Sequence, residues 1–133
     1  MEISTAKTLI ISNDFTYVDI IHSDLIKIGL KESNILKANN IEKAMYMASK
    51  QLLAIIFWDM WTITDDTSSR AIDDIQKLTK KNETKIIAYS RNLKPGAAAE
   101  FVEQNELDGY ITWPIYIDAV RQIVLKIFDA DKV

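Results

Sequence analysis

Ala54-Ile55-Ile56-Phe57-Trp58-Asp59-Met60-Trp61 is the stretch that decides the fold. Its apolar run, rich in β-branched and aromatic residues, suits a strand buried on both faces in the middle of a parallel sheet. In open α/β sheets the ligand crevice lies beyond the carboxyl ends of the strands, and this run ends there in Asp59. Asp59 is therefore a candidate site residue, although many acidic residues at such positions only begin a turn.

Four further strands and five helices are expected around this run. The strands are predicted from short apolar runs at 8–12, 34–38, 85–89 and 109–112. The helices are predicted from apolar residues at helical spacing, with Gly29 ending the first and Asn39 or Asn40 capping the second. The five patterns are Val18, Ile21, Leu25 and Ile28; Ile41, Ala44, Met45 and Ala48; Ala71, Ile75 and Leu78; Ala98, Phe101 and Val102; and Ile117, Val120, Val124 and Ile127. This alternation predicts one α/β domain over residues 1–133, with a five-stranded parallel sheet and helices on both faces.

Composition argues against several classes of function. The chain has 133 residues, of which 48% are hydrophobic and 26% charged, as in ordinary globular domains. No apolar stretch approaches the roughly 20 residues of a membrane span, and the N-terminus lacks a secretory signal, so we expect a cytoplasmic protein without membrane contact. The absence of cysteine excludes thiolate metal sites, and the single histidine, His22, argues against histidine-based catalysis. A net charge of -3 argues against nucleic acid as a partner.

Polar residues follow several of the predicted strands: Ser12-Asn13-Asp14, Asp59, Ser90 and Trp113-Pro114. Over nearly the whole chain this arrangement resembles the receiver domain of two-component response regulators, which are signalling proteins of phosphorelays and not enzymes in the usual sense. The resemblance implies a flavodoxin-like sheet with strand order 2-1-3-4-5.

The resemblance also implies roles for individual residues. Asp59 matches the phosphoacceptor, and Ser90 matches the hydroxyl residue that follows the fourth strand. Tyr110 matches the aromatic residue whose rotation reports the switch. Pro114 matches a proline that the family commonly joins through a cis bond, so we expect the Trp113–Pro114 bond to be cis.

The departures from the family pattern concern the phosphorylation site. The acidic pair of the family falls either on Ser12 and Asn13 or on Asn13 and Asp14, so at least one carboxylate is missing. Trp113 stands in the position of the family's lysine. Mg²⁺ would be held by Asn13, Asp14, Asp59 and the backbone carbonyl of Trp61, and we expect it to bind weakly. Each lost electrostatic partner typically costs ~3 kcal/mol or more of transition-state stabilisation, so the site is expected to be degenerate.

We therefore expect an atypical receiver, a pseudo-receiver, that acts by protein–protein interaction through its last two helices and final strand. Its switch and interaction residues would be Tyr110, Trp113, Pro114 and Tyr116, and its partner a histidine kinase or another signalling protein; the chain could also form a homodimer. The alternative is a working single-domain phosphoreceiver, phosphorylated on Asp59 by a histidine kinase. A small-molecule binder has less support, because no glycine-rich phosphate loop follows the first strand.

The tryptophans allow two interpretations. Trp58, Trp61 and Trp113 all fall at or near the expected crevice, and tryptophan is enriched in the energetic centres of protein interfaces. The alternative is that Trp58 belongs to the core and that Trp113 fills the space of the missing lysine. The sequence favours the core for Trp58 and leaves the other two open.

Overall fold

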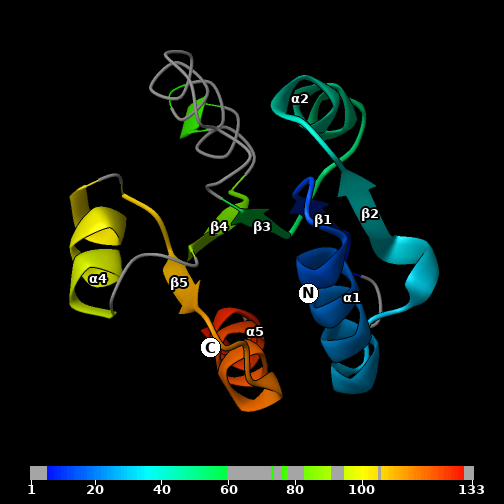
Figure 1. The fold of residues 1–133 in the computed structure, drawn as a ribbon. Coiled ribbons are helices and arrows are strands. Elements are labelled where there is room, and N and C mark those ends of the chain that lie inside the picture. The colour runs from blue at the N-terminus through cyan, green and yellow to red at the C-terminus, as the bar shows by residue number, and fades with distance from the viewer. Residues whose placement is uncertain are drawn as a thin grey trace.

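A parallel sheet lies at the centre of the molecule (Figure 1). The computed structural model describes residues 6–59, 73, 76, 77, 83–90, 95–104 and 106–130. In this part of the chain five strands pair in the order β2-β1-β3-β4-β5, which confirms the predicted fold. The elements are β1 (Thr8–Ile11), α1 (Phe15–Ile28), the 3₁₀ helix η2 (Glu32–Asn34), β2 (Ile35–Ala38), α2 (Ile41–Lys50), β3 (Ile55–Asp59), β4 (Lys85–Ser90), α4 (Pro95–Gln104), β5 (Gly109–Thr112) and α5 (Ile117–Ala130). The helix expected over 71–78 lies almost wholly outside the described residues.

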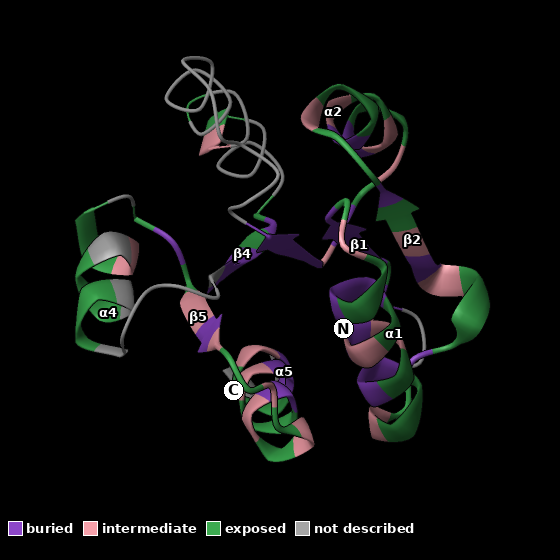
Figure 2. Cartoon of the chain, viewed as in Figure 1, coloured by how far each residue is buried: buried purple, intermediate pink, exposed green. Residues whose placement is uncertain are grey.

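Helices cover both faces of the sheet, as the sequence predicts (Figure 1). Helices α1 and α5 pack on one face, where Ile10, Phe57 and Ile87 belong to the same apolar cluster as Ile21 and Val124. On the other face a second cluster joins strand residues to α2 and to Val102 of α4. All five residues of β3 are buried, and Figure 2 shows β1 and β3 buried along their length. This is the burial expected of central strands covered on both sides.

The helix ends follow from local hydrogen bonding. Asp14 caps α1, because its carboxylate oxygen Oδ1 accepts a hydrogen bond from the backbone N–H of Thr16. Asn40 caps α2, because its side-chain oxygen accepts a hydrogen bond from the backbone N–H of Lys43; of the two asparagines, Asn40 is therefore the N-cap, and the helix begins at Ile41. Gly29 ends α1 with φ 128°, a backbone conformation that favours glycine.

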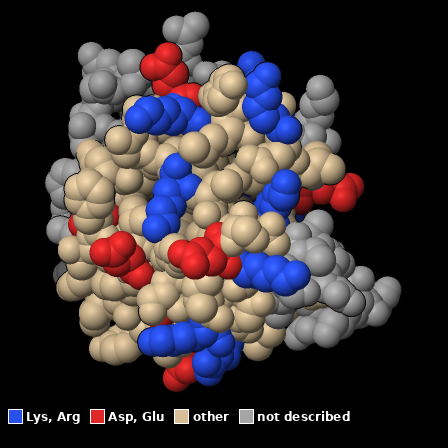
Figure 3. Space-filling model, turned by 90° about the vertical axis from the view of Figure 1, so that its right-hand side faces the viewer, with Lys and Arg blue, Asp and Glu red and all other residues tan. Residues whose placement is uncertain are grey.

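Two features of the described residues bear on membrane and nucleic-acid contacts. No helix in the described ranges is long and apolar enough to cross a membrane. On the face shown in Figure 3, lysine and arginine side chains are interspersed with aspartate and glutamate. Such a mixed face lacks the single-sign basic patch that attracts a phosphate backbone.

Asp24 is an unusual residue on the buried side of α1. It is only 7% exposed, and its carboxylate oxygen Oδ2 has no hydrogen-bond partner among the described residues. Burial raises the pKa of Asp24 above its ordinary value, and the nearby positive charge of Lys27 opposes part of this effect. Because the folded-state pKa is the higher one, the folded protein holds the proton more tightly than the unfolded chain. Ionisation of Asp24 therefore lowers stability as the pH rises past the ordinary carboxyl pKa.

We expect Asp24→Asn to stabilise the protein by roughly 1 kcal/mol at neutral pH, because it removes a buried charge with an unpaired oxygen. The gain should shrink as the pH falls from the raised pKa of Asp24 towards the ordinary value of 3.8, and it should vanish below that value, where the wild-type carboxyl is neutral in both the folded and the unfolded state. Urea unfolding at several pH values measures both effects. Asp19→Asn, on an exposed position of the same helix, is the control and should change little. A loss of stability in Asp24→Asn at neutral pH would show this account of Asp24 to be wrong.

Candidate functional site

Ser12, Asp59 and Tyr89 lie in a row across three neighbouring strands at the carboxyl edge of the sheet. Asp59 of β3 pairs with Tyr89 of β4, and Ile11 of β1 pairs with Trp58, so Ser12 comes level with Asp59. The Oγ hydroxyl of Ser12 donates a hydrogen bond to Oδ2 of Asp59 over 2.7 Å. Side chains alternate along a strand, so Asp59 shares the face of Phe57, which is covered by α1 and α5.

The Asp59 carboxylate is buried, with only 1% of the residue exposed. Ser12 is also buried, and its Oγ accepts a hydrogen bond from the backbone N–H of Asp14 over 2.9 Å. The Ser12 hydroxyl therefore accepts a hydrogen bond from the backbone at the start of α1 and donates one to the Asp59 carboxylate. A buried carboxylate needs hydrogen-bond donors to offset its loss of water, and Ser12 supplies one without bringing a charge.

Two tyrosines stack beside this carboxylate. The rings of Tyr17 from α1 and Tyr89 from β4 are parallel to within 14°, with centroids 4.2 Å apart. Both residues are fully buried, and neither hydroxyl has a hydrogen-bond partner in the part of the chain that the structure describes. Burial raises the pKa of Tyr89 to about 12, and the negative charge of Asp59 adds to the effect. Burial raises the pKa of Tyr17 well above its usual value, with further contributions from Asp59 and Tyr89, so both phenols are neutral at physiological pH.

The residues expected to hold Mg²⁺ are only partly described. Asn13 is exposed, and one carboxylate oxygen of Asp14 caps α1. The family's acidic pair can be placed on Ser12 and Asn13 or one residue later. The first placement includes a residue that contacts Asp59, because the Ser12 hydroxyl donates a hydrogen bond to its carboxylate. No group of three or more histidine, aspartate and glutamate side chains lies close enough to hold a metal in the described ranges. Asp59 and Asp14 offer carboxylate oxygens of the kind that Mg²⁺ binds, whereas Ser12 stands where the receiver pattern has an acidic residue and brings no charge. Trp61, expected to lend a carbonyl, lies outside the described residues.

The remaining predicted site residues lie at the ends of β4 and β5. Ser90 is the last residue of β4, where it pairs with Thr112 of β5. The Trp113–Pro114 bond is cis, which confirms the expectation drawn from the sequence. Trp113 is 48% exposed and Tyr116 is 66% exposed, so neither ring is part of the core. Trp58, by contrast, is 1% exposed, which agrees with its interpretation as a core residue.

A groove of about 360 Å³ lies where α4, β5 and α5 meet, on the side of the predicted interaction surface. Tyr110, the expected switch residue, lines this groove and is partly buried. The lining is largely apolar, with exposed Asp108 and Lys126 as its charged members. The full lining is Ala99, Val102, Asp108, Gly109, Tyr110, Ile123, Lys126 and Ile127.

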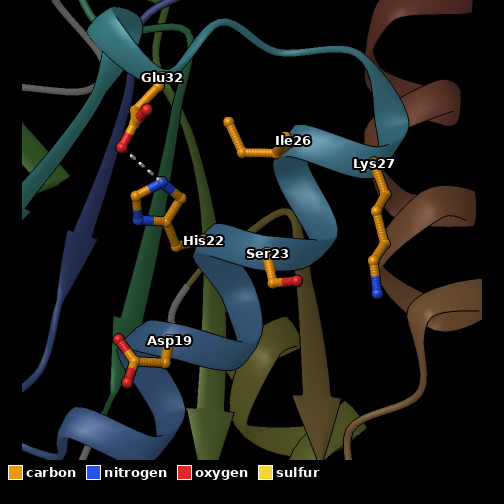
Figure 4. A pocket seen from close by; sticks show the side chains of 6 residues that line it. All are labelled: Asp19, His22, Ser23, Ile26, Lys27 and Glu32. Carbon is orange, nitrogen blue, oxygen red and sulfur yellow. Dashed lines mark ion pairs between the residues drawn. The ribbon is translucent and has the colours of Figure 1, made fainter.

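A second, shallower cavity of about 450 Å³ lies between α1 and η2 (Figure 4). His22 is partly exposed there and faces Glu32, with 3.8 Å between Nε2 and Oε1. Lys27 points away from this pair in Figure 4, and Asp19 and Ser23 line the wall. The mixture of acidic, basic and apolar groups defines no single kind of ligand.

Sequence reasoning missed Tyr17 and Tyr89 as neighbours of Asp59. Tyr17 falls on the apolar side of the α1 pattern, at 17, 18, 21 and 25, and Tyr89 alternates with Ala88 in a buried strand. These patterns predict that both rings are buried. That the two rings stack on each other depends on how α1 packs on the sheet, which no local pattern records.

Comparisons with known proteins identify the fold. Neither protein-family models nor curated proteins give a match. Among solved structures, a response regulator from Desulfuromonas acetoxidans superposes with a TM-score of 0.76 at 13% identity, covering 94% of this chain and 98% of the other. The Francisella response regulator 1452 receiver domain gives 0.74 at 20% identity, with 96% and 99% covered. A response regulator receiver domain protein from Clostridium thermocellum gives 0.73 at 15% identity, with 96% and 97% covered. The chain therefore has the fold of response regulator receiver domains.

Proposed function

We propose that this chain is a receiver-type domain of two-component signalling whose output does not depend on phosphorylation of Asp59. The observation that carries the proposal is the surrounding of Asp59: its carboxylate is 1% exposed and accepts a hydrogen bond from the neutral Ser12 hydroxyl. In the receiver pattern, acidic residues near this position help to hold a divalent cation. Phosphoryl transfer to a carboxylate needs such neutralising charges, because catalysis consists almost entirely of positioning and electrostatic stabilisation.

The domain acts, on this proposal, by binding a protein partner in the cytoplasm, either a histidine kinase or another signalling protein. The groove between α4, β5 and α5 supports this part, because it combines an apolar lining with two charged groups. The exposed rings of Trp113 and Tyr116 on the segment from β5 to α5 also support it. Exposed aromatic side chains are enriched among the residues that dominate binding energy in protein interfaces. Association of two copies of the chain through this surface is the other outcome that a binding experiment can reveal.

The competing function is phosphorylation of Asp59 with a weakly bound Mg²⁺. The position of Asp59 favours it, because the residue ends the central strand β3 at the carboxyl edge of a receiver-type sheet. A Mg²⁺ titration followed by tryptophan fluorescence distinguishes the two functions, since Trp58 directly precedes Asp59. We expect no saturable change in the emission. A saturable change that is lost in Asp59→Asn would favour the phosphoreceiver.

The proposal also predicts which side chain matters for partner binding. Asp59→Asn should leave partner affinity within about 0.5 kcal/mol, the usual scatter of substitutions without a special role. Trp113→Lys restores the family residue but removes a large exposed ring, and it should cost on the order of 2 kcal/mol or more if that ring contacts the partner. Quantitative mass spectrometry of proteins captured by the wild type and by each variant compares these effects directly.

Circular dichroism of both variants provides the control for folding. We expect the proteins captured by the wild type to be captured equally well by Asp59→Asn and to be depleted among those captured by Trp113→Lys. Loss of capture by Asp59→Asn, with Trp113→Lys unaffected, would overturn the proposal that output is independent of Asp59.

A further inference from the structure

The stacked pair of Tyr17 and Tyr89 has no counterpart among the residues that the receiver resemblance singles out. Tyr17 comes from the first turn of α1 and Tyr89 from β4, so the pair joins a helix to the sheet. The rings are in direct contact and fully buried. Stacked aromatic pairs stabilise a contact beyond the gain from burial alone. The pair therefore holds the start of α1 firmly against the sheet.

The pair lies beside the Asp59 carboxylate. Asp59 and Tyr89 are directly paired residues of neighbouring strands, and paired side chains lie side by side on the same face of a sheet. Tyr17 lies at the start of α1, which follows β1, and it stacks on Tyr89 of β4; because β3 lies between β1 and β4, this contact reaches across the strand that carries Asp59. The charge of Asp59 adds to the effect of burial in raising the pKa of both phenols. Asp59 therefore has Ser12 on one side and Tyr89 of β4 on the other.

The hydroxyls of the pair do not explain its position, because neither has a hydrogen-bond partner among the described residues. A buried hydroxyl without a partner is unfavourable. What the pair contributes is the volume and contact area of two rings. Loss of a ring should therefore affect Asp59 much more than loss of a hydroxyl.

We propose that the stacked Tyr17–Tyr89 pair is a gate that closes the Asp59 carboxylate off from solvent and small solutes. With the rings stacked, Asp59 stays in its hydrogen bond with Ser12. Displacement of the Tyr17 ring opens the carboxylate to reagents from the side of α1. The gate operates whether or not Asp59 is ever phosphorylated, so its test is separate from that of the proposed function.

Carbodiimide coupling to glycinamide tests the gate, because it converts accessible carboxylates to amides that peptide mass spectrometry locates. Labelling of Asp59 is measured relative to the exposed Asp118 in the same sample. We expect Tyr17→Ala to raise this ratio by roughly tenfold or more, since a buried group reacts in proportion to the population of open forms. Tyr17→Phe keeps the ring and should leave the ratio unchanged.

Two matched variants separate a gate from general loosening of the fold. Ile21→Ala removes a fully buried side chain one turn further along α1, and Tyr46→Ala removes an exposed tyrosine of α2. Neither should raise the labelling of Asp59. If circular dichroism shows Tyr17→Ala to be unfolded, Tyr89→Val, which suits a strand, carries the test with the same expected increase.

The proposal is overturned if the folded ring-deletion variant labels Asp59 no faster than the wild type. It is equally overturned if Ile21→Ala raises the labelling as much as Tyr17→Ala does, or if Tyr17→Phe opens the site. An increase confined to the ring deletions supports it.

Discussion

Replacing Ser12, Asn13 and Trp113 by the residues of the receiver pattern is expected to make Asp59 a much better phosphoacceptor. In the variant Ser12→Asp/Asn13→Asp/Trp113→Lys, Mg²⁺-dependent labelling of Asp59 by phosphoramidate should rise by at least about 10²-fold, because a single preorganised electrostatic partner is worth that much in rate. The two new carboxylates supply the oxygen ligands that Mg²⁺ prefers. The new lysine supplies a positive charge for the phosphoryl oxygens. Intact-protein mass spectrometry over time measures the rate.

The same triple variant carrying Asp59→Asn is the control, and it should gain no phosphoryl group. Circular dichroism in Mg²⁺ establishes that the triple variant is folded, which is necessary because Ser12→Asp places a second carboxylate beside a buried one. Equal labelling rates for the wild type and the triple variant would mean that the missing charges do not limit the chemistry. The degenerate-site account would then be wrong.

Trp58→Ala is expected to remove much of the stability of the domain. Trp58 is 1% exposed in the central strand β3 and belongs to the apolar cluster shared with α2. Truncation of a buried tryptophan to alanine costs about 3–5 kcal/mol, from lost burial and the cavity left behind. Domains of this kind are typically stable by only about 5–15 kcal/mol. Urea unfolding followed by circular dichroism measures the change.

Trp58→Phe is the matched variant, because it keeps an aromatic ring and removes the buried indole N–H, which has no acceptor among the described residues. Its cost should stay below about 1.5 kcal/mol, as for other substitutions that keep most of the core volume. Equal losses in the two variants would show that the indole N–H matters more than packing at this position.

The fold could be predicted from the sequence because its main signals are local. The run from Ile55 to Phe57 is apolar at every position, which is typical of a strand covered on both faces. The strand order came from the resemblance, since polar residues at successive strand ends match the receiver pattern. The sequence predicted a second strand from Asn34, whereas the structure has a 3₁₀ turn over Glu32–Asn34 and a strand from Ile35. A shift of one residue at a strand end is within the ordinary precision of such patterns.

The site was predictable only in part. Asp59 could be identified because one carboxylate ends an otherwise apolar run. The choice between Ser12 and Asp14 as its neighbour could not be made, because it depends on where β1 ends and α1 begins. Ile11 is the last strand residue and Asp14 the helix cap, and this leaves Ser12 level with Asp59. The stacking of Tyr17 on Tyr89, the neighbour of Asp59 on β4, depends on the packing of a helix on the sheet, which acts between segments far apart in the sequence.

Beryllofluoride, which mimics a phosphoryl group on aspartate, tests the central claim most directly. Amide NMR spectra recorded with and without beryllofluoride and Mg²⁺ report on Ser90 at the end of β4 and on Tyr110 in β5, where receivers transmit the switch. If the output of this domain is independent of Asp59, both amide signals should stay where they are in the free protein. Large shifts of Ser90 and Tyr110 that disappear in Asp59→Asn would contradict the account and identify a working phosphoreceiver.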